Sequence, residues 1–568
     1  WYHVIRGMVL CQGTLESRSP LCWYAWMPYV LYQAFLSIFY RGGVMLATLT
    51  GLWVQGQERP NVLIAFADDW GRFASAYQDQ GPYSGLNRLL STPTFDRVAQ
   101  EGVLFQNAFV TAPSCTPCRS SLLSGQYFWR TGQGAILQGA RWDASIPTFP
   151  LLLGKAGYHL GETYKVWTPG SPADAPYGAG RHAFEKAGRK FNQFSQQVTR
   201  MVDKGMAVSK AKQALYDEVL ANFNDFLDAR PDSKPFCYWF GPTLVHRKWT
   251  KGSGKRLWGL DPDQLEGHMP PFLPDVAEVR EDMADYFGEI QAFDAALGLI
   301  LKRLEELGEL DRTVVIISGD HGPPGFPHGK CNLYDFGVGV PLAIHWPGQP
   351  GGRKLEDFVN LMDLAPTVLE LAGVDVPSVM TGKSLVPQLQ SEASGWIDPS
   401  RNWVVTGRER HVAAARSGNV GYPQRAIRTE DFLYIVNFQP DRWPMGDPLH
   451  RLSDDLPTSE QLRQNTFATF ADMDASPTKG WIFEHREDPR WAEHFQRAFG
   501  KRPFVELYDV SKDPHQIHNV ANENSYARIQ GKMHEQLMAV LRDSLDPRVI
   551  EHPVRYEAPP YAGDDKER

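Results

Sequence analysis

The sequence is poor in cysteine, with six in 568 residues. Cys11 and Cys22 lie near its start, and the other four follow no regular spacing: Cys115, Cys118, Cys237 and Cys331. Disulfide-rich domains and zinc modules need cysteines at characteristic spacings. The sequence therefore predicts neither a disulfide framework nor a cysteine-based zinc site.

The chain also lacks an excess of positive charge and any internal repeat. Its formal net charge is -8, whereas proteins that bind nucleic acids present a basic surface. We therefore expect no nucleic-acid partner, and an anionic ligand would need a local basic pocket. The tripeptide Gly382-Lys383-Ser384 lacks the upstream spacing of a phosphate-binding loop, so nucleotide binding is not predicted either.

The first 57 residues are expected to be a leader. Residues 44–54 are apolar, follow Arg41 and precede Gln55-Gly56-Gln57, which is the pattern of a secretory signal. We therefore expect export to the periplasm or the exterior, with removal near Gly56. A single spanning helix over residues 29–54, which would anchor the protein in a membrane, is the alternative.

Two apolar runs that predict buried strands end in residues suited to bind metal. Residues 60–67 lead to Asp68 and Asp69, and residues 313–318 lead to Asp320 and His321. Continuous apolar runs are typical of parallel strands in α/β sheets, whose ligand sites lie at the carboxyl ends of the strands. Adjacent carboxylates repel each other unless a cation or hydrogen bonds compensate, and a strand-end turn with solvated carboxylates is the alternative. The four side chains are therefore candidate ligands of a divalent metal.

The chain is organised around Cys115. Residues 103–110 predict a strand, Pro113 breaks it, and a helix is predicted from Thr116. Cys115 would then lie at a helix N-terminus, where free N–H groups and the helix dipole favour an anionic ligand. A buried cysteine that never reacts is the alternative.

The sequence Cys115-x-Pro117-x-Arg119 in this position resembles the signature of the type I sulfatase family. The Asp68-Asp69 pair, Lys165, Asp320 and Lys330 also occur in the order of that family. The resemblance spans residues 60–545. Within the family, four segments resemble heparan N-sulfatases (N-sulfoglucosamine sulfohydrolases, or sulfamidases): residues 331–334, 381–385, 422–426 and 506–515.

The resemblance implies an enzyme that hydrolyses sulfate ester or sulfamate groups of a sulfated saccharide. Cys115 would be oxidised to formylglycine by a formylglycine-generating enzyme, and its hydrated aldehyde would supply the nucleophilic oxygen. Arg119 would hold the hydrate, and His246 would protonate the leaving group. Lys165 and Lys330 would grip the sulfate.

The resemblance also implies one divalent metal, for which calcium is the usual choice and the histidine leaves manganese or magnesium open. The implied ligands are Asp68, Asp69, Asp320, His321 and Cys115. Four residues near the chain's C-terminal end are candidate contacts to the sugar, with surface salt bridges as the alternative: Arg408, His411, Tyr422 and Arg425. The oligomeric state stays open.

Some positions depart from the family pattern. Sulfatases carry Gly-Lys-x-His around Lys165, but this sequence has Tyr164 and Trp167 at those positions. They often carry His-x-Pro-His at the positions of residues 243–246. This sequence has Thr243 and Val245 in place of the first histidine and the proline, and it keeps the second histidine as His246. Asp320-His321 replaces the usual Asp-Asn and is closer to related phosphonate and phosphodiester hydrolases. Such a hydrolase, or a glycan-binding relative without activity, is therefore the alternative.

The strand pattern and the resemblance predict an α/β fold of alkaline-phosphatase type. Residues 58–390 would form the catalytic domain, with a mixed, mostly parallel sheet flanked by helices, and residues 251–274 would be a long loop. From about residue 391 the sequence becomes polar and the predicted strands short. Residues 391–557 would form a smaller α+β domain with an antiparallel sheet, followed by a disordered tail at 558–568.

Overall fold

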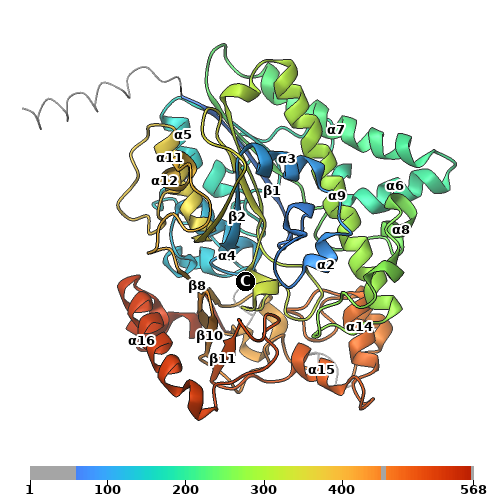
Figure 1. Ribbon diagram of the computed structural model, residues 1–568, viewed down its shortest axis with the longest axis vertical. Helices are drawn as coiled ribbons and strands as arrows, with labels where there is room; N and C mark the ends of the chain where they lie inside the picture. Colours follow the sequence, from blue (N-terminus) through green and yellow to red (C-terminus); the bar gives the residue numbers. More distant parts are fainter. Residues whose placement is uncertain (1–58, 449–455, 564–568) are drawn as a thin grey trace, which may run out of the picture. The chain divides into compact units, whose positions relative to one another are not determined.

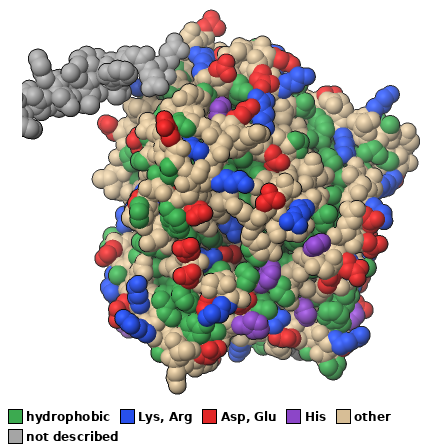
Figure 2. Space-filling model, in the orientation of Figure 1, with side chains coloured by type: hydrophobic (Ala, Val, Ile, Leu, Met, Phe, Trp, Pro, Cys, Tyr) green, Lys and Arg blue, Asp and Glu red, His purple; other side chains and the backbone are tan. Residues whose placement is uncertain are grey.

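The computed structural model describes residues 59–448 and 456–563 (Figure 1). From Arg59 onward the chain forms one compact unit, whereas the predicted leader lies outside the described residues. No helix within the described ranges is both long and apolar enough to cross a membrane. Acidic and basic side chains are interspersed over the face seen in Figure 2, which agrees with a surface that is not basic overall.

The larger sheet has seven strands in the order β3-β4-β1-β5-β6-β2-β7. β1 (Asn61–Ala67) lies between β4 and β5 and is parallel to both, while β6 is antiparallel to β5 and β2. The predicted mixed, mostly parallel sheet is therefore confirmed. The other strands are β2 (Val103–Phe109), β3 (His159–Tyr164), β4 (Phe236–Gly241), β5 (Thr313–Gly319), β6 (Leu342–His345) and β7 (Arg353–Asn360).

Helices cover both faces of this sheet, which explains why β1 is apolar at successive positions. Leu63 and Ala65 face a core shared with three helices: α3 (Pro93–Glu101), α7 (Val208–Asp228) and α9 (Ala277–Glu306). Val62 and Ile64 face the opposite core, which is shared with α4 (Cys115–Ser124), α5 (Phe149–Lys155) and α11 (Leu364–Leu371). The sheet is thus a rigid platform whose strand ends can hold a site.

A second, antiparallel sheet has the order β11-β10-β9-β8, as predicted for the C-terminal part. Its strands are β8 (Trp403–Arg408), β9 (Gln424–Thr429), β10 (Phe432–Asn437) and β11 (Val505–Asp509). Helix α16 (Ala527–Asp543) packs on it through Met533, Leu537 and Leu541. In Figure 1 the C-terminal elements, drawn in orange to red, lie below the larger sheet and beside α4. The boundary at residue 390 stays a prediction.

Three local predictions differ from the structure. Residues 251–274 contain α8 (Ser253–Trp258), because Gly254 lets this segment pack against the backbone of α9 at Ala284. Strand β7 was not predicted, because charged residues interrupt its apolar pattern. One of them, Arg353, is nevertheless buried, and its guanidinium donates hydrogen bonds to backbone carbonyl groups. Tyr561, in the predicted tail, is buried.

The remaining helices are α2 (Ser84–Asn87), α6 (Phe194–Asp203), α10 (Asp335–Val338), α12 (Val386–Gln390), α13 (Ser459–Gln464), α14 (Pro477–Glu484), α15 (Ala492–Phe499) and α17 (Pro547–Ile550).

Glu162 on β3 makes the stability of this fold depend on pH. Its side chain is 1% exposed, and neither carboxylate oxygen has a hydrogen-bond partner among the described residues. Burial, with help from Asp174 and Glu185, raises its pKa from 4.5 to about 8. The folded protein therefore keeps a proton that the unfolded chain loses, so stability falls as pH rises from about 4.5 to about 8.

Glu162→Gln is expected to increase the free energy of unfolding at pH 8 by about 2 kcal/mol and to change it little at pH 5. Urea unfolding at both pH values measures this difference. Glu535→Gln, at an exposed position of α16, is the matched control and is expected to have no pH-dependent effect. Equal effects of Glu162→Gln at the two pH values would show that Glu162 is ionised in the folded protein.

Candidate active site

The ends of β1 and β5 bring four predicted metal ligands together. The two strands pair in parallel with Ala67 opposite Gly319, so the residues that follow them meet at one edge of the sheet. The Asp69 N–H donates to Asp320 Oδ1 at 2.7 Å, and Asp69 adopts a left-handed backbone conformation (φ 58°) that allows this contact. Asp68, Asp69, Asp320 and His321 are all buried. The sequence therefore located this edge correctly.

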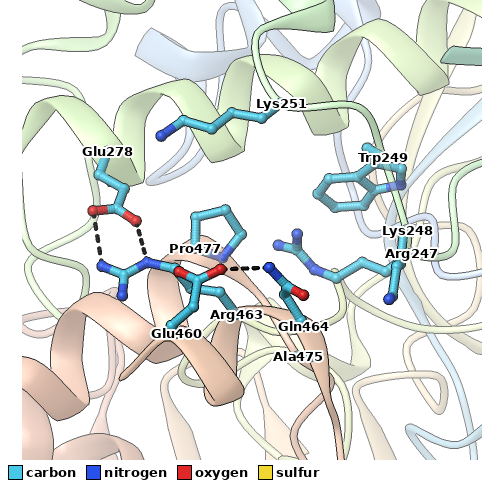
Figure 3. A pocket seen from close by; sticks show the side chains of 10 residues that line it. All are labelled: Arg247, Lys248, Trp249, Lys251, Glu278, Glu460, Arg463, Gln464, Ala475 and Pro477. Atoms are coloured by element: carbon cyan, nitrogen blue, oxygen red, sulfur yellow. Dashed lines mark hydrogen bonds and ion pairs between the residues drawn. The ribbon is translucent and has the colours of Figure 1, made fainter. Parts of the chain in front are cut away.

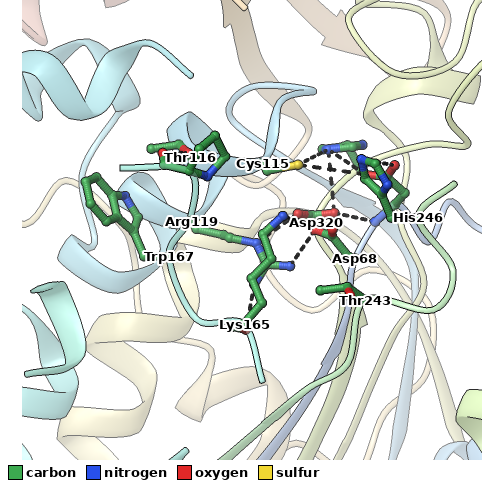
Figure 4. Close-up of polar contacts among 12 residues, drawn as sticks. Asp68, Cys115, Thr116, Arg119, Lys165, Trp167, Thr243, His246 and Asp320 are labelled. Carbon is green, nitrogen blue, oxygen red and sulfur yellow. Dashed lines mark hydrogen bonds and ion pairs between the residues drawn. The ribbon is translucent and has the colours of Figure 1, made fainter. Parts of the chain in front are cut away.

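Cys115 is the first residue of α4 and points into the same cluster (Figure 4). Its Sγ lies 3.4 Å from His321 Nε2 and 3.8 Å from Asp69 Oδ1. Burial raises the pKa of the thiol well above its usual value, and the Asp68 carboxylate adds to this effect. The unmodified side chain is therefore a neutral thiol at physiological pH rather than a reactive thiolate.

Arg119, one turn further along α4, links the residues that follow β1 and β5. It is fully buried, and its guanidinium donates to Asp320 Oδ2 and Asp68 Oδ1, each at 2.9 Å. It also donates to the backbone carbonyls of Lys165 and Val166. Although burial opposes its charge, the Asp320 and Asp68 carboxylates raise its pKa. Arg119 therefore connects β1, β5 and the chain that follows β3.

Two buried lysines supply positive charge to the cluster. Lys165 Nζ donates to both oxygens of Asp68, at 2.7 and 2.8 Å. Lys330 Nζ lies 3.1 Å from Asp69 Oδ2 and 3.4 Å from Asp474 Oδ2. Burial alone would lower the pKa of both amines. Nearby carboxylates more than offset this effect: Asp68 raises the pKa of Lys165, and Asp474 with Asp69 raises that of Lys330. Both amines therefore stay charged. The two ammonium groups and Arg119 thus balance most of the negative charge of the carboxylates in this cluster.

The residues present fit a divalent metal. Asp69, Cys115, Asp320 and His321 each offer a ligand atom, and these atoms lie within 4.8 Å of one another. His321 Nδ1 lies 3.1 Å from the Gly322 carbonyl, which assigns its proton to Nδ1 and leaves Nε2 free to coordinate. Burial raises the pKa of Asp320, and Asp68 and Asp69 repel its charge, as expected where a cation would compensate.

Asp68 was predicted as a metal ligand, but it occupies a different environment from this group. Its oxygens accept hydrogen bonds from Lys165 and Arg119. Burial alone would raise its pKa, yet these two cations bring the pKa well below its usual value. Asp68 lies in a second candidate group with Asp69 and His246. Asp68 therefore binds the two basic side chains here and stays a predicted metal ligand.

His246 lies on the solvent side of the cluster. Its Nε2 is 3.8 Å from Asp69 Oδ2, and its side chain is 33% exposed, whereas Asp69 is fully buried. Its Nδ1 lies 2.5 Å from the Arg247 carbonyl and donates to it, so Nε2 faces the site. His246 therefore lies at the exposed edge of the cluster, and its role as the acid that protonates the leaving group stays a prediction.

The positions that depart from the family pattern have structural explanations. Tyr164 adopts φ 75°, a conformation that favours the glycine found there in the family. Trp167 is fully buried and donates from Nε1 to Ser120 Oγ at 2.8 Å, so it packs the core as expected. The Thr243 N–H donates to Asn192 Oδ1. Neither the indole of Trp167 nor the hydroxyl of Thr243 can exchange a proton near neutral pH as a histidine does.

The predicted sugar contacts need correction. Arg408 is paired with Asp472, and Arg425 with Asp546 and Glu409, and both arginines are buried at 2% exposure or less. Tyr422 is also fully buried, beside Arg408. These three side chains stabilise the C-terminal part and have no surface for a saccharide. His411 does reach the site, where its Nδ1 lies 2.8 Å from Ser114 Oγ, and burial lowers its pKa to about 3.

Sequence reasoning missed Asp474 and Tyr286. Asp474 belongs to the polar segment before α14 and lies beside Lys330. Burial alone would raise the pKa of Asp474. The positive charge of Lys330, and after it that of His246, brings this pKa well below its usual value. The hydroxyl of Tyr286 on α9 donates to the Asp69 carbonyl and accepts from the Gly71 N–H, each at 3.0 Å. No local pattern marks either residue, because both depend on packing between distant segments.

Comparisons with known proteins agree with this geometry. The family model described as Sulfatase matches residues 60–374, and the model described as N-sulphoglucosamine sulphohydrolase, C-terminal, matches residues 324–448. The chain is 29% identical over 516 residues to the N-sulphoglucosamine sulphohydrolase of Homo sapiens, covering 86% of this chain and 91% of that protein.

Two solved structures share the fold. A protein in complex with its substrate D-glucosamine-2-N,6-O-disulfate has a TM-score of 0.54 at 19% identity, covering 86% of this chain and 98% of that one. The phosphonate monoester hydrolase of Agrobacterium radiobacter has a TM-score of 0.57 at 20% identity, covering 86% of this chain and 96% of that one. At these identities the likeness concerns the fold alone.

Proposed function

Because the chain belongs to the sulfatase family, we propose that it hydrolyses a sulfate ester or sulfamate group on a sulfated saccharide. One observation carries the proposal: Cys115, at the start of α4, faces a buried cluster of carboxylates and a histidine with a lysine on either side. Such a cluster offers charge-assisted donors to sulfate oxygens and a fixed position for a nucleophile.

We assign the nucleophile to formylglycine at position 115. The neutral thiol of Cys115 is a weak nucleophile, because burial and Asp68 raise its pKa. A hydrated aldehyde would supply an oxygen nucleophile instead. Conversion needs a formylglycine-generating enzyme, which is a partner in maturation under this proposal. The leader predicted at residues 1–57 makes export, to the periplasm or the exterior, part of the same proposal.

The chain's own residues have separate tasks. Lys165 and Lys330 stay protonated and donate hydrogen bonds to sulfate oxygens, which lowers the cost of bringing an anion to the nucleophile. Arg119 positions residue 115 and both strand ends. His246 holds a proton at Nε2 and gives it to the departing nitrogen or oxygen, while its Nδ1 stays bound to the Arg247 carbonyl.

The side chains that would hold the divalent metal are those of Asp68, Asp69, Asp320, His321 and residue 115. When bound, such a metal supplies Lewis-acid polarisation of the sulfate group. Calcium is the metal we propose, because three of these five side chains are carboxylates. The nitrogen of His321 favours manganese as the first alternative, and magnesium, which prefers oxygen ligands, is the second.

The proposed substrate is a sulfated amino sugar. The relative from Homo sapiens is named for N-sulphoglucosamine, and one structural neighbour was solved with a glucosamine that carries both N- and O-sulfate. Sulfate release from N-sulfated and 6-O-sulfated glucosamine saccharides, followed by ion chromatography, tests the proposal and separates the two linkages. We expect release from at least one of them.

Phosphonate or phosphodiester hydrolysis is the second candidate, favoured by the Asp320-His321 pair and by the fold shared with a phosphonate monoester hydrolase. Aryl sulfate and aryl phosphodiester substrates with the same leaving group are compared side by side. Faster turnover of the sulfate is expected. Faster turnover of the phosphodiester, without sulfate release from any saccharide, would replace the proposal with the second candidate.

A further inference from the structure

The carboxylate of Asp474 has a hydrogen-bonding capacity that the protein itself leaves unused. Its Oδ2 lies 3.4 Å from Lys330 Nζ, but this oxygen is buried and accepts no hydrogen bond from the described residues. Although burial alone would raise the pKa of Asp474, Lys330 and then His246 hold that pKa well below its usual value, so the carboxylate is ionised. A buried, ionised oxygen without a donor costs free energy, which favours a ligand that supplies the donor.

The two oxygens of Asp69 divide the catalytic cluster into two sides. Oδ1 lies 3.8 Å from Cys115 Sγ, which is the side of the nucleophile. Oδ2 lies 3.1 Å from Lys330 Nζ and 3.8 Å from His246 Nε2. Because Asp474 contacts Lys330, it belongs to this second side, where the acid that protonates the leaving group is proposed.

The segment after β4, which carries His246, and the segment before α14, which carries Asp474, are tied to the same residue of α9. The Arg247 guanidinium donates to both oxygens of Asp282, at 2.7 and 2.8 Å, and the Thr478 hydroxyl at the start of α14 donates to Asp282 at 2.6 Å. Figure 3 shows residues of both segments along one pocket of about 620 Å³. The fold therefore holds the acid and the unused carboxylate on neighbouring segments.

The two linkages of a sulfated amino sugar differ in the atom that leaves. In a sulfamate, a bond forms between sulfur and the oxygen of residue 115, the S–N bond breaks, and the nitrogen keeps the electron pair and takes a proton from His246. The amine then takes a second proton from the solvent, because alkyl amines are protonated at neutral pH. In a sulfate ester the S–O bond breaks, and the departing oxygen takes one proton and stays neutral.

A fixed carboxylate distinguishes these two leaving groups. The sulfamate nitrogen carries a hydrogen that can be donated to a carboxylate, whereas the ester oxygen carries none. The ammonium group that forms after cleavage of the sulfamate is also attracted by the negative charge, whereas a neutral hydroxyl is not. A carboxylate beside the leaving group thus favours the N-linked sulfate.

We propose that Asp474 determines which linkage the enzyme prefers: its carboxylate accepts a hydrogen bond from the sulfamate nitrogen, and N-sulfated amino sugars are therefore cleaved faster than O-sulfated ones. The inference rests on the proposed function and chooses between the two linkages that the proposed function leaves open. Asp474 exchanges no proton. It selects the leaving group, and His246 supplies the proton.

Asp474→Asn keeps the shape of the side chain and removes its charge. For N-sulfated glucosamine, kcat/KM is expected to fall about thirtyfold, because a charge-assisted hydrogen bond to the leaving nitrogen is lost. For 6-O-sulfated glucosamine and 4-nitrophenyl sulfate, from which an oxygen leaves, kcat/KM is expected to stay within about threefold of wild type. Ion chromatography of the released sulfate measures all three. Asp543→Asn, at the exposed end of α16, is the matched control and should change none of them.

Binding of the desulfated sugar provides a second measurement, without turnover. Glucosamine carries an ammonium group and N-acetylglucosamine does not, and calorimetry compares their binding to Cys115→Ala with and without Asp474→Asn. The added substitution is expected to weaken glucosamine binding about tenfold and to leave N-acetylglucosamine binding unchanged.

Equal losses of kcat/KM for the N- and O-sulfated substrates would overturn the inference, because Asp474 would then act only by supporting Lys330. Equal effects on the binding of the two sugars would overturn it as well. If no substrate released sulfate, the proposed function itself would be contradicted, and the binding comparison would still decide whether Asp474 recognises an amine.

Discussion

Cys115→Ala is expected to reduce the rate of sulfate release by at least about 10⁴-fold, because alanine cannot become formylglycine and offers no nucleophile. Among the described residues, the polar contacts of Cys115 Sγ are with His321 and Asp69 only. The variant should therefore fold, and its affinity for the saccharide should change little. Single-turnover sulfate release and calorimetric binding measure the two quantities separately.

Cys118→Ala is the matched control for this variant. Cys118 lies one turn further along α4 and is equally buried, but it packs into the apolar core rather than the cluster. We expect wild-type kcat and a loss of about 1 kcal/mol in stability. If Cys115→Ala kept substantial activity, the nucleophile would not be residue 115, and if Cys118→Ala also abolished activity, the loss in Cys115→Ala would not be specific to the nucleophile.

His246→Gln is expected to show the second largest effect, and that effect should depend on the leaving group. Loss of a positioned general acid costs about 10² to 10⁴-fold when the leaving group is the poorly acidic nitrogen or oxygen of a saccharide. An activated aryl sulfate such as 4-nitrophenyl sulfate leaves without a proton, so the loss should be about tenfold or less. The ratio of kcat values for the two substrates is the measurement.

The exposed His268 provides the control, since His268→Gln changes the same residue type on the surface. It is expected to leave both kcat values unchanged. An equal loss for the two leaving groups in His246→Gln would mean that His246 positions the substrate or Asp69, which lies 3.8 Å from its Nε2, and does not transfer a proton.

The catalytic edge could be predicted because its position follows from local sequence. Buried parallel strands have recognisable apolar runs, and the register of β1 with β5 places Asp69 beside Asp320. The helix start at Cys115 follows from the same reasoning, since Pro113 ends the strand and Gly125 ends the helix in a left-handed conformation. Short-range rules are sufficient to recognise the strands and the helix, whereas the register of β1 with β5 is a long-range feature that the structure adds.

The C-terminal contributions could not be predicted in this way. Arg408 and Arg425 were expected at the saccharide, but their charges are neutralised by Asp472 and by Asp546, carboxylates far along the chain. Asp474 reaches Lys330 because Lys479 Nζ binds carbonyl groups of residues 469, 470 and 473 and so holds the segment folded. A polar segment without periodicity carries no sign of such long-range contacts.

The central claim is that residue 115 is formylglycine in the active enzyme, and the mass of the tryptic peptide 98–119 from protein made in its native host tests it most directly. The peptide also contains Cys118, which serves as an internal reference for unmodified cysteine. We expect formylglycine at 115 and cysteine at 118. An unmodified Cys115 in fully active protein would contradict the account, because the buried thiol would then have to be the nucleophile.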